Sequence, residues 1–139
     1  MIVTMIDSNV LLDVLTEDGN WLRWSSDALA RCADEGSLVI NPLIYAEIPV
    51  GFTTIEELEA AVPSEVFHRV PLPWEAAFLA GKAFLRYRGS GGVKSSPLPG
   101  FHIGAHAAVG RFRLLTRDTR KYRTYFPTVN LIAPQNPGG

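Results

Sequence analysis

A chain of 139 residues, 47% hydrophobic and 19% charged, has the composition of one globular domain, which argues against a disordered protein. Its apolar runs fall short of the roughly 20 residues needed to cross a bilayer, and its first residues lack a positively charged leader. The single cysteine, Cys32, cannot form an internal disulfide, and no Cys/His cluster has zinc-site spacing. We therefore expect one cytoplasmic domain without a membrane partner over residues 1–134, followed by a flexible Pro/Gly tail at 135–139.

The net charge of −1 conceals a segregation of charge along the chain. Residues 1–75 hold 13 of the 14 acidic residues and three Lys/Arg, which gives −10. Residues 76–139 hold ten Lys/Arg and one acid, Asp118, which gives +9. Such asymmetry indicates a nucleic-acid or acidic partner. The alternative is that folding interleaves the two halves and neutralises them.

Strands and helices are predicted to alternate along the chain. Short apolar runs predict strands at 2–6, 37–40, 67–70, 112–116 and 129–132. Apolar residues at helical spacing predict helices directly after Asp7, at 21–34, from Asn41 to about Pro49, and at 53–61, 73–87 and 100–109. Residues 88–99, rich in Gly, Ser and Pro, are predicted to form a loop. This order predicts a three-layer α/β/α sandwich around a parallel sheet of four or five strands.

Three acidic residues are placed where an open parallel sheet binds its ligands, beyond the carboxyl ends of strands. Asp7 follows the first predicted strand, Asp118 follows the strand that ends at Thr116, and Glu47 lies about two turns into the helix after the second strand. Clustered carboxylates repel one another unless a cation neutralises them, which favours Mg²⁺ or Mn²⁺. A metal held in this way can activate water against a phosphodiester.

Each of these acids also has a structural explanation. Asp7 could cap the helix that follows it, and Asp118 could cap the turn before Lys121. Glu47 stands between Ala46 and Ile48, so we expect it to be buried and to need a partner.

Four motifs, read in order along the chain, carry a specific resemblance. They are residues 5–13 (MIDSNVLLD), 41–47 (NPLIYAE), 98–107 (LPGFHIGAHA) and 114–118 (LLTRD), and the match continues through 122–127 to 132–134. They resemble the motifs of PIN-domain ribonucleases and are most similar to those of VapC-like toxins. The resemblance implies a Mg²⁺-dependent endoribonuclease that is inhibited by a cognate antitoxin and is usually a homodimer. It further implies that Asp7, Glu47 and Asp118 are catalytic residues and bind the metal or its water.

One position departs from the family pattern. Where the family shows aspartate in Leu-Pro-Asp-Phe, this chain has Gly100, and that aspartate normally joins the first one at the metal. Residues 76–117 contain no acid, and the nearby His102 and His106 are poor Mg²⁺ ligands. We therefore expect weakened metal affinity and much reduced cleavage. The intact flanking residues favour an inactivating substitution over a naturally degenerate toxin.

Several cationic and aromatic residues near these motifs suit contacts with RNA. Tyr87 and Tyr122 could stack on unpaired bases, whereas His106 is better explained as a helix-packing residue than as a general base. For each cation the alternative is a solvated charged face. The cations that we expect at RNA phosphates are Arg86, Arg88, Lys94, Arg117, Arg120, Lys121 and Arg123.

The sequence thus predicts a metal-dependent endoribonuclease of the toxin type, and two other classes remain open. Gly100 favours a PIN fold without cleavage that binds RNA or an antitoxin. A phosphatase or nucleotide-binding enzyme is disfavoured, because no Gly-x-x-x-x-Gly-Lys loop occurs and the residues after Asp7, Ser8 and Asn9, supply no second aspartate.

Overall fold

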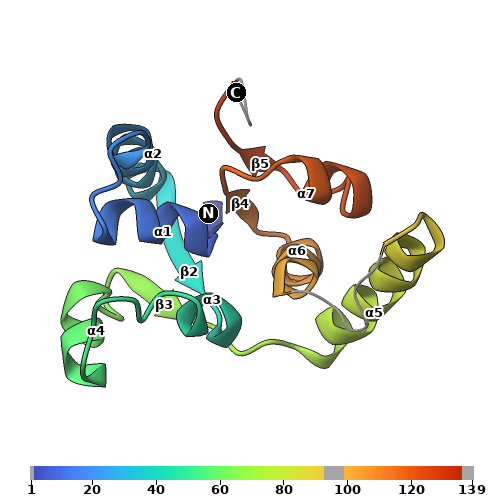
Figure 1. The fold of residues 1–139 in the computed structure, drawn as a ribbon, viewed down its shortest axis with the longest axis horizontal. Coiled ribbons are helices and arrows are strands. Elements are labelled where there is room, and N and C mark those ends of the chain that lie inside the picture. Colours follow the sequence, from blue (N-terminus) through green and yellow to red (C-terminus); the bar gives the residue numbers. More distant parts are fainter. Residues whose placement is uncertain (1, 93–98, 136–139) are drawn as a thin grey trace.

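The computed structural model describes residues 2–92 and 99–135. Strands and helices alternate through the described chain (Figure 1). In order they are β1 (Ile2–Ile6), α1 (Ser8–Leu15), α2 (Leu22–Glu35), β2 (Gly36–Ile40), α3 (Pro42–Ala46), α4 (Ile55–Ala61), β3 (Phe67–Arg69), α5 (Trp74–Gly89), α6 (Pro99–Gly110), β4 (Arg113–Leu115), α7 (Arg120–Tyr125) and β5 (Leu131–Ile132).

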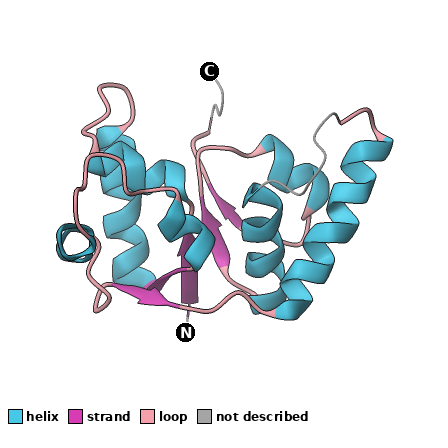
Figure 2. Ribbon diagram, turned by 60° about the horizontal axis from the view of Figure 1, so that its bottom comes forward, coloured by secondary structure: helices cyan, strands magenta, loops and turns pink. Residues whose placement is uncertain are grey.

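The strands form a five-stranded sheet in the order β3-β2-β1-β4-β5, and every neighbouring pair is parallel. Helices α1 and α2 lie on one side of the sheet, and α5, α6 and α7 lie on the other (Figures 1 and 2). The predicted α/β fold with a central parallel sheet is confirmed. None of the helices in the described ranges is long and apolar enough to cross a membrane.

The central strands are apolar on both faces because helices cover both sides of the sheet. Met5, Ile6 and Ile40 have no exposed surface, and neither do Leu114 and Leu115 of β4. A side chain at Gly36 is excluded, because its Cβ would overlap the carbonyl oxygen of Ile2 where β2 begins beside β1.

Two helices differ from the sequence prediction. Helix α3 ends at Ala46, and Glu47 is its C-cap instead of an interior residue. The reason is Pro49, which lacks an N–H and disfavours helical backbone at Ile48. Helix α7 was not predicted, because its residues are mostly polar and its N-cap, Thr119, makes no side-chain capping hydrogen bond. The other predicted starts and ends agree with the structure to within two residues, except that residues 93–98 of the predicted loop and 136–139 of the predicted tail lie outside the described ranges.

A buried pair, Asn41 and His106, joins α3 to α6. The Oδ1 atom of Asn41 accepts from the backbone N–H of Ile44 at 2.9 Å, which leaves the amide Nδ2 to donate to Nδ1 of His106 at 3.1 Å. His106 Nδ1 therefore carries no proton, and the ring is neutral. Burial also lowers the pKa of His106. This agrees with the predicted packing role of His106.

The state of this histidine makes the stability of the fold depend on pH. Because the pKa of His106 is lower in the folded chain than in the unfolded chain, its contribution is complete above pH about 6.5 and is lost as the pH falls. We expect the free energy of unfolding, measured with urea, to decrease below that pH. His106→Gln should flatten this decrease, whereas His68→Gln, at an exposed position, should not. An equal effect of both substitutions would contradict the assignment.

Candidate functional site

The carboxyl ends of β1 and β4, where the strand order reverses direction, open into a small pocket of about 170 Å³. This is the position at which open α/β sheets bind their ligands. The pocket brings together the three acids singled out from the sequence, and Gly100 lies in the same wall. Its lining residues are Asp7, Ser8, Asn9, Glu47, Gly100, Ile103, Asp118, Lys121 and Tyr122.

Asp7 is the buried acid of this pocket, with 4% of its surface exposed. Its Oδ1 accepts from the backbone N–H of Ser8 at 2.8 Å, as the N-cap of α1. Its Oδ2 accepts from the hydroxyls of Thr116 and Tyr122, each at 2.8 Å. The carboxylate therefore links β1 to the end of β4 and to α7. It also caps α1, which is the structural role that the sequence offered as an alternative.

Burial raises the pKa values of both Asp7 and Tyr122. Loss of water around the buried carboxyl raises the pKa of Asp7, and the hydrogen bonds from Tyr122 and Thr116 oppose that shift. Burial also raises the pKa of Tyr122 well above its ordinary value, and the negative charges of Asp7, Asp118 and Glu47 add to the effect. Tyr122 thus remains a hydroxyl donor. It is 1% exposed, so the prediction that it stacks on RNA bases is wrong.

Glu47 and Asp118 are the exposed acids of the pocket. The Oε1 atom of Glu47 accepts from the hydroxyl of Ser8 at 2.9 Å, which aims this C-cap residue of α3 at the end of β1. The expectation that Glu47 is buried is wrong, because α3 ends before it and the chain turns toward solvent. The side chain of Asp118 is 50% exposed, and its Oδ2 lies 3.8 Å from Nζ of Lys121.

The missing side chain at position 100 leaves space that another residue uses. A Cβ built on Gly100 would overlap Nζ and Cε of Lys121. The ammonium group therefore occupies the place in which a family aspartate would begin. Lys121 was predicted as an RNA contact, and the structure places it in the wall of the carboxylate pocket.

The donor set is chemically suited to Mg²⁺, since it consists of carboxylate oxygens. In this structure, however, the three acids line the pocket without being drawn together around one point. In the chain outside 1, 93–98 and 136–139, no three His, Cys, Asp or Glu side chains are placed to hold a metal together. Both oxygens of Asp7 accept hydrogen bonds from the protein, and the ammonium of Lys121 is already present. The pocket as it stands is thus neutralised in part by the protein's own cation.

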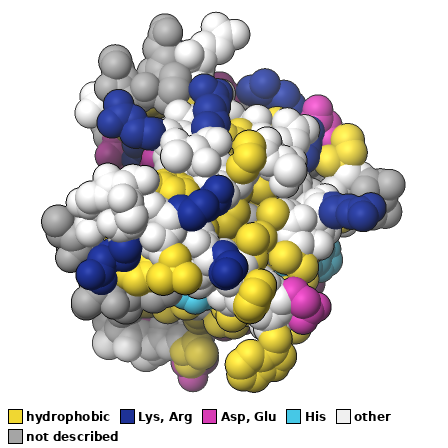
Figure 3. All heavy atoms as spheres, turned by 90° about the vertical axis from the view of Figure 1, so that its right-hand side faces the viewer, with side chains coloured by type: hydrophobic (Ala, Val, Ile, Leu, Met, Phe, Trp, Pro, Cys, Tyr) yellow, Lys and Arg dark blue, Asp and Glu magenta, His cyan; other side chains and the backbone are white. Residues whose placement is uncertain are grey.

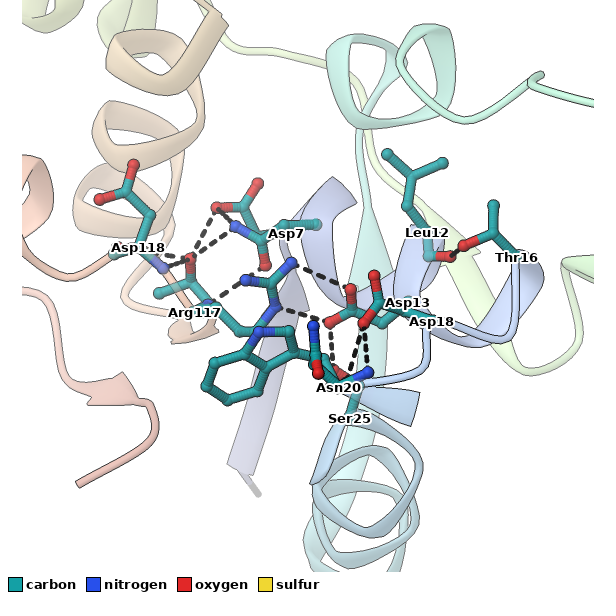
Figure 4. A network of polar contacts seen from close by, with 12 residues as sticks. Asp7, Leu12, Asp13, Thr16, Asp18, Asn20, Ser25, Arg117 and Asp118 are labelled. Atoms are coloured by element: carbon teal, nitrogen blue, oxygen red, sulfur yellow. Dashed lines mark hydrogen bonds and ion pairs between the residues drawn. The ribbon is translucent and has the colours of Figure 1, made fainter. Parts of the chain in front are cut away.

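Arg117 has a structural role beside the pocket. Its Nε and Nη2 donate to the two carboxylate oxygens of Asp13 at 2.6 and 2.9 Å (Figure 4). Its guanidinium lies over the ring of Trp21. The hydroxyl of Ser25 completes the cluster at 2.6 Å from Asp13. Arg117 was predicted to contact RNA, but its guanidinium holds a buried carboxylate. Its backbone N–H donates to Asn9, which fixes the loop that carries Asp118.

The fold keeps the acidic and basic halves of the chain largely apart. The first half builds β1 to β3 and α1 to α4. The basic half builds β4 and β5, and α5 to α7, which lie on the side of the sheet away from α1 and α2 (Figure 1). Figure 3 looks at that side and shows more Lys and Arg than Asp and Glu. Of the predicted phosphate contacts, Arg86, Arg88, Arg120 and Arg123 are exposed on α5 and α7, and Lys94 lies outside the described residues.

The PIN domain model matches residues 4–127, so the chain belongs to the PIN domain family. No curated protein sequence matches it significantly.

Solved structures of toxin–antitoxin complexes share the fold at low sequence identity. A chain of VapBC2 from Rickettsia felis matches with a TM-score of 0.73 and 14% identity, over 96% of this chain and 100% of that one. A chain of VapBC-1 from nontypeable Haemophilus influenzae matches at 0.72 and 15%, over 95% and 98%. A chain of FitAcB from Neisseria gonorrhoeae matches at 0.70 and 16%, over 96% and 97%. The fold is therefore that of the VapC and FitB toxins.

The structural role assigned to Arg117 can be tested by its removal. Arg117→Met leaves the carboxylate of Asp13, 3% exposed, without its counter-ion, so we expect a loss of about 3 kcal/mol in the free energy of unfolding. Arg120→Met removes a cation at an exposed position of the next helix and should cost less than about 0.5 kcal/mol. Denaturant unfolding of both variants gives the comparison, and similar losses would show that the Asp13 pair does not stabilise the fold.

Proposed function

We propose that this chain is the toxin of a toxin–antitoxin pair and that its pocket is a metal-dependent endoribonuclease site weakened at Gly100. The observation that carries the proposal is the convergence of Asp7, Glu47 and Asp118, from three distant segments, on one pocket that Gly100 also lines. This convergence is what the family motifs imply for a nuclease. A binding protein without chemistry has no need to gather carboxylates at the end of its sheet.

Each pocket residue has a distinct part in this proposal. Asp7, Glu47 and Asp118 would hold Mg²⁺ or Mn²⁺, which when bound supplies an activated water and stabilises charge on a phosphodiester. The hydroxyl of Ser8 orients the Glu47 carboxylate, and the hydroxyl of Tyr122 orients that of Asp7. The exposed cations of α5 and α7 would bind the RNA backbone. Gly100 leaves the donor set one carboxylate short, which lowers both metal affinity and cleavage.

The partners proposed are a cognate antitoxin and a second copy of this chain. The similar structures include one described as a toxin–antitoxin complex from Klebsiella pneumoniae, at 20% identity with a TM-score of 0.65. For self-association, α5 carries a stripe of exposed apolar side chains. Trp74, Phe78 and Leu85 are 88%, 70% and 64% exposed, and their spacing puts them on one side of the helix, where hydrophobic side chains are visible in Figure 3.

A second candidate is a PIN-fold protein that binds RNA or antitoxin without cleavage. It is favoured by the ammonium of Lys121 in the pocket and by the lack, within residues 2–92 and 99–135, of three side chains placed to hold a metal. The nuclease candidate predicts that a carboxylate restored at position 100 increases RNA cleavage, and the binding candidate predicts that it does not.

Restoring the carboxylate provides the test. Gly100→Asp should increase Mg²⁺-dependent cleavage of RNA by about tenfold or more, since metal affinity rises with the number of charged oxygen ligands. Position 100 is in the first turn of α6, where the helix dipole favours an acid, and the flexible end of the Lys121 side chain must move to admit the new Cβ. Cleavage is followed with a fluorogenic RNA in Mg²⁺ and in EDTA.

The matched control is Gly100→Asp with Asp7→Asn, which should remain as inactive as the parent. Equal activity of the parent and Gly100→Asp, or activity that survives EDTA, would reject the nuclease site in favour of the binding candidate. Hydrolysis of a phosphomonoester with no cleavage of RNA would instead point to a phosphatase.

The self-association proposal has its own test. A charge placed in the α5 stripe by Phe78→Glu should convert the dimer to a monomer in light scattering, because a buried unpaired carboxylate opposes association. Val50→Glu, which alters an apolar residue 63% exposed outside α5, should leave the dimer intact. A parent chain that is monomeric at micromolar concentration, or a Phe78→Glu variant that stays dimeric, would contradict this surface.

A further inference from the structure

The relation between Gly100 and Lys121 is specific in its geometry. Gly100 lies in the first turn of α6, and Lys121 is the second residue of α7. The end of the lysine side chain fills the volume that any side chain at position 100 would need. Glycine has a normal helical backbone there, since its φ is not among the positive values. The lysine side chain fits here because glycine has no side chain, and not because the backbone of Gly100 has a special conformation.

The Lys121 ammonium lies among acidic and aromatic side chains. The carboxylate of Asp118 lies 3.8 Å away, three residues earlier in the chain. Asp7 and Glu47 line the same small pocket, and the ammonium is also 5.5 Å from the centre of the Tyr122 ring. The side chain is only 26% exposed, which distinguishes it from a lysine extended into solvent. The positive charge of Lys121 also opposes the rise that burial causes in the pKa of Asp7.

We propose that the Lys121 ammonium is a resident cation of the carboxylate pocket, admitted by Gly100, and that it competes there with a divalent ion. This rests on the proposed function, since it concerns the same site. The loss of the side chain at position 100 then acts twice. It removes one carboxylate from the donor set, and it opens the space through which a tethered positive charge reaches the remaining acids.

The competition can be measured without RNA, by the binding of Mn²⁺ to the full chain followed by electron paramagnetic resonance. Lys121→Gln should tighten Mn²⁺ binding by about tenfold to thirtyfold, the effect expected of one charge some 4 Å from a divalent ion in a water-like dielectric. Gly100→Ala adds no ligand, yet its methyl group should displace the ammonium and tighten binding in the same direction. The control Lys82→Gln removes an exposed lysine on α5 and should leave Mn²⁺ binding unchanged.

Thermal unfolding provides a second readout. Without metal, Lys121→Gln should unfold at a lower temperature than Lys82→Gln, because the pocket acids have lost their counter-ion. Added Mn²⁺ should replace that charge and remove the difference between the two unfolding temperatures. Circular dichroism verifies that each variant is folded.

The outcomes separate this inference from the proposed function. If Gly100→Asp binds Mn²⁺ more tightly than the parent but neither Lys121→Gln nor Gly100→Ala does, the resident-cation proposal is overturned and the proposed function stands. If Gly100→Asp gains neither Mn²⁺ binding nor cleavage, the proposed function fails. Tighter Mn²⁺ binding in both Lys121→Gln and Gly100→Ala would then still support competition by the ammonium.

Discussion

The structure of the site depends on one buried carboxylate. Asp7 is desolvated at the end of β1, and such a group is tolerable only when its oxygens are fully hydrogen-bonded. The donors come from α1, from the end of β4 and from α7. Satisfying Asp7 therefore fixes the mutual position of segments separated by more than one hundred residues, and it places Asp118 and Lys121 beside it. The local geometry of the pocket follows from this requirement more than from any direct contact between the acids.

The elements that sequence reasoning predicted well are those whose signals are local. The strand at Ile2–Ile6 is a continuous apolar run because helices cover both faces of the sheet, and Pro73 marks the start of α5. Helix α7 escaped prediction because its stability comes from contacts that no window of sequence displays. Tyr122 is its one buried residue, and the phenol is held by a partner 115 positions away. Arg86 also donates to the backbone carbonyl of Tyr125. A short helix held by such long-range hydrogen bonds has no periodic pattern to read.

In the candidate site too, the features with local sequence signals were predicted and those that depend on tertiary contacts were not. Asp7 and Asp118 were predicted from their places after strands, since parallel strands bring their carboxyl ends to one edge. Glu47 was assigned to the correct region for an incorrect reason, because Pro49 ends α3 early and leaves the acid exposed at the C-cap. Arg117 and Tyr122 were assigned to RNA from their charge and ring, whereas Asp13 and Asp7 engage them. Composition identifies cations and aromatics, but only tertiary structure shows which of them are already paired.

The place of Lys121 was beyond sequence reasoning for a different reason. The absence of an acid at position 100 was evident in the sequence, but an absent side chain also creates volume, and volume is a property of the folded chain. The pocket has acids on several sides. A flexible lysine within reach of that volume is therefore stabilised electrostatically when its ammonium group enters it. A carboxylate lost from a metal site can therefore be followed by an internal cation without any further substitution. For the proposed metal site, the consequences of Gly100 thus extend beyond a missing ligand, to the net charge of the pocket and to the access of any divalent ion.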